Sequence, residues 1–91
     1  MTKVLLKVNV AYPGEFQKVF NSQASTRQRG GERSCTLGSD DSIHNHVYAI
    51  LDWESVQSAQ SFWVTQAAKT LMKDWSSVEA PQITVLRESP D

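Results

Sequence analysis

Basic runs, paired cysteines and long apolar segments are missing from this sequence of 91 residues, and each absence excludes a class of protein. Nine Lys and Arg residues are scattered among ten Asp and Glu residues, which argues against nucleic acid and anionic membrane surfaces as main partners. The single cysteine, Cys35, excludes an internal disulfide framework and suits a reducing compartment. No apolar run is long enough to span a bilayer.

The amino-terminal segment also lacks the features of a secretory signal. Lys7 interrupts its apolar residues, and no small-residue cleavage site follows. We therefore expect a cytoplasmic protein with no membrane partner. The 91 residues are expected to form one domain, 1–91, and a domain of this size buries only about 60 to 65% of the surface of its unfolded chain. Oligomerisation would relieve the small stability margin that results.

Four segments have the residues of β-strands: 3–10, 32–39, 46–53 and 82–88. In the first, apolar side chains alternate with other residues, which predicts one buried face. The third contains neither Gly nor Pro and is rich in β-branched and aromatic residues, as a central strand is. The second is short and polar, which suits an edge position.

Two helical regions separate these strands. The first begins near Pro13 and continues to Ala24 or Arg27 before the pair at 30–31, both glycines, ends it. Its apolar face consists of Phe16, Val19 and Phe20. The spacing of these residues predicts an amphipathic helix that covers the sheet.

The second helical region begins at Ser55, whose hydroxyl is expected to cap it. Phe62 falls outside its apolar stripe on an ideal helix. Either Phe62 reaches a partner subunit or the helix breaks near 63–65, with Thr65 starting a second segment, and we favour the break. The stripe consists of Val56, Ala59, Trp63, Ala67, Leu71 and Trp75, widened by Val64, Ala68 and Met72. This pattern favours core positions for Trp63 and Trp75 over a haem or flavin site.

The order strand, helix, strand, strand, helix, strand predicts an α+β fold of the ferredoxin-like class. Its antiparallel sheet would have the spatial order 4-1-3-2, with both helices on one face. The other face would be open in a monomer. We expect a homodimer in which two such sheets pair into an α+β barrel, because the open face carries many apolar residues. These are Leu5, Tyr48, Ile50 and Leu86.

A candidate small-molecule site follows from this arrangement. The first and third strands should be antiparallel neighbours, so Asn9 should lie near His46 and Tyr48. We predict that Asn9 donates to a developing oxyanion, that Tyr48 hydrogen-bonds a phenolic substrate, and that His46 acts as a general base. Substrate-binding roles are predicted for Lys7, Ile50 and Asp52. The competing interpretation is that the polar residues bind only water and the opposite subunit.

The turn before the third strand raises the question of a metal site. His44 and His46 project on the same side and could hold a metal with Asp40, Asp41 or Cys35. Spacing fixes only the His pair, so we expect no metal and a hydrogen-bonded hairpin instead. Cys35 is not expected to act as a nucleophile, because no local cation and helix N-terminus together lower its pKa. A buried or half-buried thiol is expected instead.

Residues along most of the chain carry a resemblance to a known family. They are Arg27, Gly30, Gly31, the run 37–41, Asn45, Val47, the run 51–55, Ala59, Phe62, Met72, Pro81, Leu86 and Glu88. With this pattern the sequence resembles a widespread group of small dimeric α+β-barrel proteins related to the antibiotic-biosynthesis-monooxygenase-like superfamily. The most similar members are uncharacterised. The sequence departs from the pattern at Trp75 and Ser76, where a small residue and Gly would be expected.

The resemblance specifies a fold more closely than an activity, because the superfamily includes oxygenases, cyclases, haem-degrading enzymes and proteins without known catalysis. Its cofactor-independent oxygenases act on activated aromatic substrates with comparable Asn, Tyr and Trp groups. Haem-degrading members use an Asn on the first strand and a helical His that ligates iron. Asn9 matches, but no His lies between Val56 and Trp75, so we expect no haem and no other cofactor.

Two classes of function therefore fit the sequence. The first is a small enzyme, a cofactor-independent monooxygenase or a cyclase or isomerase, that acts on a hydrophobic aromatic or polyketide-like molecule. The second is a non-catalytic dimeric binding or stress-related module with a closed barrel. An open cavity lined by Asn9, His46 and Tyr48 would favour the first class.

Overall fold

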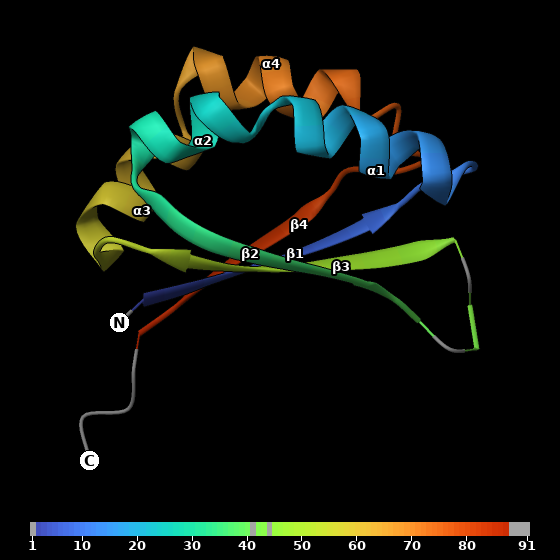
Figure 1. Ribbon diagram of the computed structural model, residues 1–91, viewed down its shortest axis with the longest axis horizontal. Coiled ribbons are helices and arrows are strands. Elements are labelled where there is room, and N and C mark those ends of the chain that lie inside the picture. The colour runs from blue at the N-terminus through green and yellow to red at the C-terminus, as the bar shows by residue number, and fades with distance from the viewer. Residues whose placement is uncertain (1, 41, 44, 88–91) are drawn as a thin grey trace.

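The computed structural model describes residues 2–40, 42–43 and 45–87. One four-stranded antiparallel sheet has the order β2-β3-β1-β4, and the helices cover one of its faces (Figure 1). This order is the predicted 4-1-3-2 read from the opposite edge, so the ferredoxin-like fold is confirmed. The elements are β1 Thr2–Asn9, α1 Pro13–Ser22, α2 Ala24–Gly30, β2 Glu32–Ser39, β3 His46–Trp53, α3 Val56–Trp63, α4 Gln66–Asp74 and β4 Gln82–Leu86.

The two central strands, β1 and β3, supply the floor of the core. Their side chains alternate between the helix-covered face and the open face, because successive residues of a strand point to opposite sides. Val4 pairs with Leu51 and Leu6 with Ala49, and all four are almost completely buried. The edge strand β2 lies where the polar composition of 32–39 predicted it. β4 ends at Leu86 although the sequence predicted that it continues through Arg87, and the predicted end at Glu88 lies outside the described residues.

An aromatic cluster fills the space between helices and sheet. Phe16 meets the ring of Trp75 edge-on, with centroids 5.6 Å apart, and Phe62 meets Trp63 in the same way at 5.0 Å. Trp53 of β3 packs against Phe62 at 5.3 Å. Trp63 and Trp75 are therefore core residues, as predicted. Aromatic side chains bury large apolar areas, which a chain of this length needs.

The second helical region breaks where the sequence predicted. Thr65 caps α4 by accepting a hydrogen bond from the N–H of Ala68, and Ser55 caps α3 in the same way through Ser58. The break turns Phe62 into the core, so Phe62 does not need a partner subunit to be buried. The break also changes which residues face the core, because α4 does not continue the rotation of α3. Two predicted members of the apolar stripe, Val64 and Ala67, are exposed.

The first helical region is also divided, which the periodicity of the sequence did not predict. The division falls at Gln23, whose amide forms two buried bonds: it donates to the carbonyl of Leu71 at 3.3 Å and accepts from Trp75 Nε1 at 2.8 Å. Contacts to the last turn of α4 and to Trp75 after it thus hold the residue that separates α1 from α2. Gly31 ends α2 with φ of 127°, a conformation that favours glycine.

No helix in the described ranges is long and apolar enough to cross a membrane.

Candidate functional site

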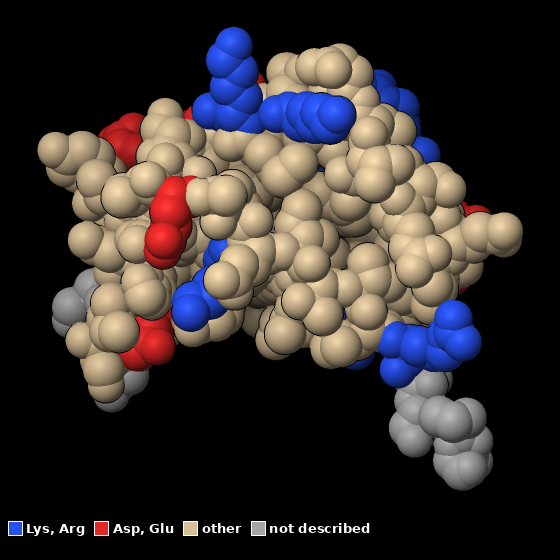
Figure 2. Space-filling model, turned by 180° about the vertical axis from the view of Figure 1, so that it is seen from behind, with Lys and Arg blue, Asp and Glu red and all other residues tan. Residues whose placement is uncertain are grey.

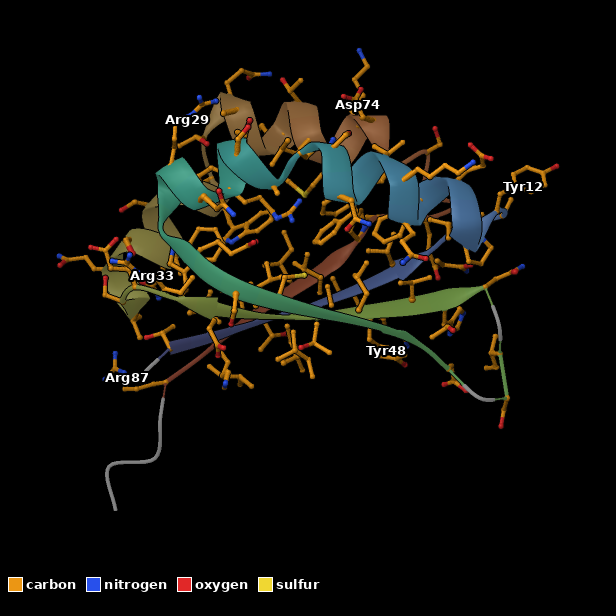
Figure 3. The ribbon with its side chains drawn as sticks, viewed as in Figure 1. Tyr12, Arg29, Arg33, Tyr48, Asp74 and Arg87 are labelled. Carbon is orange, nitrogen blue, oxygen red and sulfur yellow. The ribbon has the colours of Figure 1, made fainter. Side chains whose placement is uncertain are left out.

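The open face of the sheet carries all six residues for which the sequence predicted a site role. The β1–β3 register pairs Asn9 with His46 and Lys7 with Tyr48. Tyr48 points away from the helices in Figure 3. Four polar side chains from two neighbouring strands therefore lie together at one end of this face. This is the juxtaposition that the antiparallel pairing predicted.

Ile50 lies in the middle of the open face, beside its partner Leu5. Ile50 is 45% exposed, and Leu86 on β4 is 42% exposed. Both are large aliphatic side chains on a surface that no helix covers. The polar end of the face therefore continues directly into an apolar surface, a combination that suits small organic molecules or a second protein surface.

Asp52 lies at the opposite end of β3 from His46, and its carboxylate is already engaged. Lys3 Nζ donates to one of its oxygens and the Ser34 hydroxyl donates to the other. These hydrogen bonds, first from Lys3 and then from Ser34, hold the pKa of Asp52 below its ordinary value of 3.8. The arrangement ties β1, β2 and β3 together across the open face. Asp52 is thus separated from the polar end that contains Asn9.

The loop between α4 and β4 adds a carboxylate that sequence reasoning missed. Asn9 Nδ2 donates to Glu79 Oε1 at 3.2 Å, and the N–H of Val78 donates to the carbonyl of Asn9 at 2.7 Å. Lys7, Asn9 and Glu79 line a hollow of about 20 Å³. No local pattern marks Glu79, because it reaches Asn9 only when the loop returns along β1.

Lys7 is the cation at this end of the face. Its Nζ lies 6.0 Å from the centroid of the Tyr48 ring, at the outer limit of a cation–π contact. Lys7, Asn9, His46 and Tyr48 therefore combine an ammonium group, an amide, an imidazole and a phenol. Together they can bind an anionic oxygen, donate hydrogen bonds and accept a proton.

The turn before β3 does not gather metal ligands among the residues that the structure places. Asp40 accepts hydrogen bonds from the N–H groups of Ser42 and Ile43, and these bonds lower the pKa of its carboxyl. His44 and Asp41 lie outside the described residues. Within the described part of the chain, no group of three His, Cys, Asp or Glu residues could hold a metal ion.

Cys35 is exposed, which corrects the prediction of a buried or half-buried thiol. It lies on the edge strand β2, where no further strand covers it. Partial desolvation of the thiol, followed by the charge of Glu32, raises its pKa above the ordinary value. A raised pKa leaves less thiolate at neutral pH, so Cys35 is a poor nucleophile.

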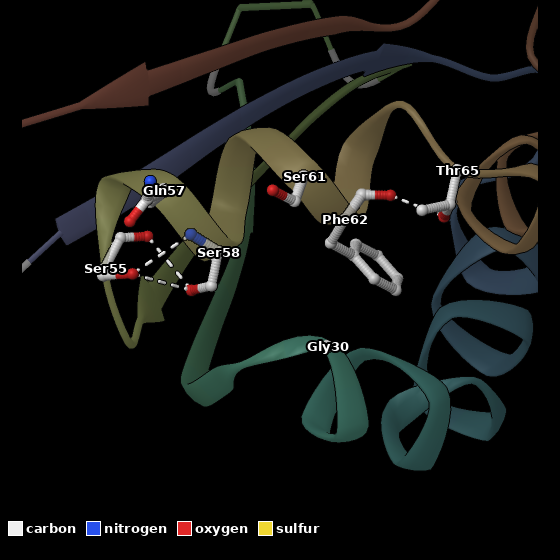
Figure 4. Close-up of a pocket in the computed structure, with 7 residues that line it drawn as sticks. All are labelled: Gly30, Ser55, Gln57, Ser58, Ser61, Phe62 and Thr65. Carbon is white, nitrogen blue, oxygen red and sulfur yellow. Dashed lines mark hydrogen bonds between the residues drawn. The ribbon is translucent and has the colours of Figure 1, made fainter.

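A second hollow, of about 460 Å³, lies between α2 and α3 (Figure 4). Most of its polar groups lie at the starts of α3 and α4. Ser55 and Ser58 bond to each other at the start of α3, and Thr65, at the start of α4, donates to the carbonyl of Phe62. These hydroxyl groups serve the backbone, which leaves few groups to bind a ligand. Its lining residues are Gly30, Ser55, Gln57, Ser58, Ser61, Phe62 and Thr65.

The surface electrostatics agree with the scattered charges of the sequence. Figure 2 shows basic side chains at the upper edge, over the helices, and further basic side chains at the lower right and lower left, with acidic side chains on the left. A nucleic-acid-binding domain would present a continuous basic stripe. The described residues on this side of the molecule do not form one.

Comparisons with known proteins find similarity in structure alone. No protein-family model and no curated protein matches the sequence. A candidate antibiotic biosynthesis monooxygenase from Bordetella bronchiseptica superposes with a TM-score of 0.82 at 15% identity, over 97% of this chain and 96% of that chain. SnoaB from Streptomyces nogalater, a cofactor-independent oxygenase, superposes in a variant form with a TM-score of 0.77 at 17% identity, over 99% and 94%.

A conserved protein from Methanosarcina mazei also superposes, with a TM-score of 0.74 at 14% identity, over 97% of this chain and 92% of that chain. Identities this low establish the fold and do not carry an activity with them. The resemblance seen in the sequence is confirmed at that level: the chain has the ferredoxin-like fold of the antibiotic biosynthesis monooxygenase-like proteins.

Proposed function

We propose that the protein is a cofactor-independent oxygenase that acts on a small aromatic or polyketide-like molecule held against the open face of the sheet. The observation that carries the proposal is the register of β1 and β3, which groups Lys7, Asn9, His46 and Tyr48 beside an apolar surface. The fold shared with SnoaB, itself a cofactor-independent oxygenase, supports it.

Each polar residue has a role that its chemistry permits. His46 takes a proton from an activated carbon of the substrate, because imidazole is a base near neutral pH. Asn9 donates to the oxyanion that develops as the proton leaves. Tyr48 hydrogen-bonds a phenolic oxygen of the substrate, and Lys7 and Ile50 bind its anionic and apolar parts. Asp52, held by Lys3 and Ser34, acts by fixing the adjacent strands.

The reaction balances without a metal or an organic cofactor. Removal of a proton from a CH₂ group that is conjugated through an aromatic ring with a ketone gives a carbanion, which transfers an electron to O₂. The resulting substrate carbon radical and superoxide combine into a peroxide. Loss of water from this peroxide leaves a new carbonyl group at the carbon that was the CH₂ group. The substrate gains one oxygen atom and loses two hydrogen atoms, which depart with the second oxygen atom as water. His46 returns its proton to the departing oxygen.

The proposed site requires a cover, and we propose that a second copy of the chain supplies it as a homodimer. Ile50 and Leu86, each more than two-fifths exposed in the monomer, would be buried between two open faces. Light scattering coupled to size exclusion at micromolar concentration tests the assembly. A monomer at that concentration contradicts the homodimer.

The activity test is oxygen consumption with anthrone, an electron-rich aromatic ketone that carries an activated CH₂ group. The enzyme should accelerate O₂ uptake over buffer, and His46→Ala and Asn9→Ala should each lower the rate by about 10²-fold or more. Thr84→Ala is the matched control, because Thr84 is exposed on the same face and has no assigned role. Oxygen uptake also distinguishes an oxygenase from a cyclase or isomerase, because these enzymes would use the same base without consuming O₂.

A second candidate function is a non-catalytic dimeric binding module with a closed barrel. It is favoured by the internal bonds of the polar groups: Asn9 is engaged by Glu79, and Asp52 by Lys3 and Ser34. In that case Tyr48 and Ile50 would fill the barrel of the dimer. A crystal structure of the dimer with a filled interior, together with no O₂ uptake above buffer, would replace the oxygenase by this module.

A further inference from the structure

Gly38 leaves a gap in the row of side chains that contains Tyr48 on the open face. In the β2–β3 register Gly38 is opposite Tyr48, and in the β1–β3 register Tyr48 is opposite Lys7. Paired residues point to the same face of a sheet, and Tyr48 points away from the helices in Figure 3. In this row β2 therefore presents bare backbone, where β3 presents a phenol and β1 an ammonium group.

The conformation and packing of β2 do not require glycine at position 38. Among the described residues, the glycine with a positive φ is Gly31. The register shift in β2 lies between Glu32 and Ser34, so Gly38 does not form a bulge. A Cβ at Gly38 would meet no atom of the described residues within 4 Å. Glycine weakens the interior of a strand, and it often marks a place where a ligand approaches the backbone closely.

The ring of Tyr48 does not fill the gap. A cross-strand aromatic side chain can lie over a glycine of an edge strand and shield its backbone. Here the distances exclude that arrangement, because a ring over Gly38 would lie within 4 Å of the added Cβ. The cation near Tyr48 is Lys7, whose Nζ lies 6.0 Å from the ring centroid, and Lys7 belongs to β1 on the far side of β3 from β2. The side of Tyr48 toward β2 therefore has no side chain opposite it in this row.

The gap lies between two residues that the proposed site already uses. The diagonal neighbours of Gly38 on β3 are His46 and Ile50, each about 7 to 8 Å away in an antiparallel ladder. His46 is the proposed base, and Ile50 is 45% exposed. A ring over the backbone of Gly38 thus has the base at one end and an apolar side chain at the other.

We propose that Gly38 determines which substrates the proposed oxygenase site accepts, because the gap above its backbone admits a flat aromatic ring beside Tyr48. This inference rests on the proposed function, since it concerns the same open face. Attraction between ring carbons and the backbone is greatest at about 3.5 to 4.0 Å. A side chain at position 38 would hold the ring farther away, and a globular molecule would contact the backbone with few atoms. The gap therefore selects planar rings.

The test adds side chains of increasing size at Gly38 and measures binding separately from reaction. The probe is anthraquinone-2-sulfonate, a flat, water-soluble molecule without an activated CH₂ group. Amide resonances of the isotope-labelled protein are followed during titration to about 5 mM, which detects a Kd near 1 mM. We expect saturable shifts at Gly38 and Tyr48 in the parent protein. Binding should be weaker in Gly38→Ala and about tenfold weaker in Gly38→Val. Camphor-10-sulfonate, which is compact and not flat, should bind the parent about tenfold more weakly than the probe does.

Stability separates a role in recognition from a role in folding. Gly38→Val should keep or raise the melting temperature, because valine favours a strand and its Cβ meets no described atom. Thr36→Val is the matched control, because Thr36 is exposed on the same face of β2 and already carries a branched side chain. This control should leave binding of the probe unchanged within about twofold.

Oxygen uptake with anthrone distinguishes this inference from the proposed function. In an active protein, Gly38→Val should raise KM for anthrone by about tenfold and change kcat less. Binding of the probe that is lost in Gly38→Val, in a parent that does not accelerate O₂ uptake, overturns the oxygenase and keeps the gap as an aromatic binding site. The inference itself is overturned if the parent gives no saturable shift with the probe, or if Gly38→Val binds the probe and oxidises anthrone as the parent does.

Discussion

Arg27 Nε donates to Glu32 Oε1 at 2.6 Å, and both side chains are at least 96% buried. Arg27 also donates through Nη1 to the carbonyl of Phe20 at 2.6 Å, and its guanidinium lies 3.7 Å from the centroid of the Phe20 ring. One side chain of α2 thus holds the end of α1 and the start of β2 together. A buried charge needs such partners, because the core cannot solvate it.

Removal of one member of this pair should strongly destabilise the protein. Arg27→Met leaves the Glu32 carboxylate buried and unpaired, so we expect the free energy of unfolding to fall by about 3 to 5 kcal/mol. Urea denaturation followed by tryptophan fluorescence measures the change. Glu15→Gln is the control, because the exposed Glu15–Lys18 pair contributes only about 0 to 1 kcal/mol. If the free energy of unfolding fell equally in Arg27→Met and Glu15→Gln, burial of the Arg27–Glu32 pair would not be the cause of the destabilisation.

Ser76→Gly should stabilise the protein. Ser76 has φ of 52°, the left-handed region in which a side chain is disfavoured. The resemblance placed Gly at this position, and the backbone conformation gives the physical reason. We expect relief of this strain to raise the free energy of unfolding by about 1 kcal/mol. The gain is partly offset because Gly increases the conformational entropy of the unfolded chain. Ser77→Gly is the control, because Ser77 has no positive φ, and it should be neutral or destabilising. A loss of stability in Ser76→Gly contradicts the prediction.

Gly31→Ala should destabilise the protein, and Gly14→Ala should not. A Cβ at Gly31 would lie 2.6 Å from Trp53 Nε1, at a residue whose φ is 127°. We expect a cost of about 1 to 3 kcal/mol from the backbone alone. A Cβ at Gly14 meets no atom within 4 Å. Ala at this position of helix α1 should therefore raise the free energy of unfolding by about 0.5 to 1 kcal/mol. The melting temperature should fall in Gly31→Ala and rise in Gly14→Ala, each compared with the parent protein.

Asp52 should make stability depend on pH in the acid range. Its pKa in the folded protein is below the ordinary 3.8, because Lys3 and Ser34 donate to the carboxylate. The folded state therefore binds fewer protons than the unfolded chain at low pH. The stabilisation is fully present above the ordinary pKa and is lost as the pH falls through the lower, folded-state value. Other carboxyl groups titrate in the same range.

The contribution of Asp52 is isolated by comparison of variants. The difference in melting temperature between the parent protein and Asp52→Asn should be largest near neutral pH and should shrink as the pH falls below 3.8. Ser34→Ala removes one of the two donors and should show part of the effect. A difference that stays constant with pH would show that Asp52 acts by packing rather than by charge.

Local sequence patterns determined most of the secondary structure. The alternation in β1 and β3 has period two, so it specified both the strands and the face that each residue occupies. The hydroxyl of Thr65 marked the break between α3 and α4, because a helix start depends on a capping group that lies in the same few residues. The grouping of Asn9, His46 and Tyr48 followed from the antiparallel order of these strands.

Only the tertiary structure decided the features that join distant segments. The amide of Gln23, the residue between α1 and α2, bonds to Leu71 and Trp75, and Glu79 reaches Asn9 because the loop after α4 returns along β1. The engagement of Asp52 by Lys3 and Ser34 likewise joins three strands. Such contacts depend on how packed elements bring far parts of the chain together, and periodicity within one element carries no information about them.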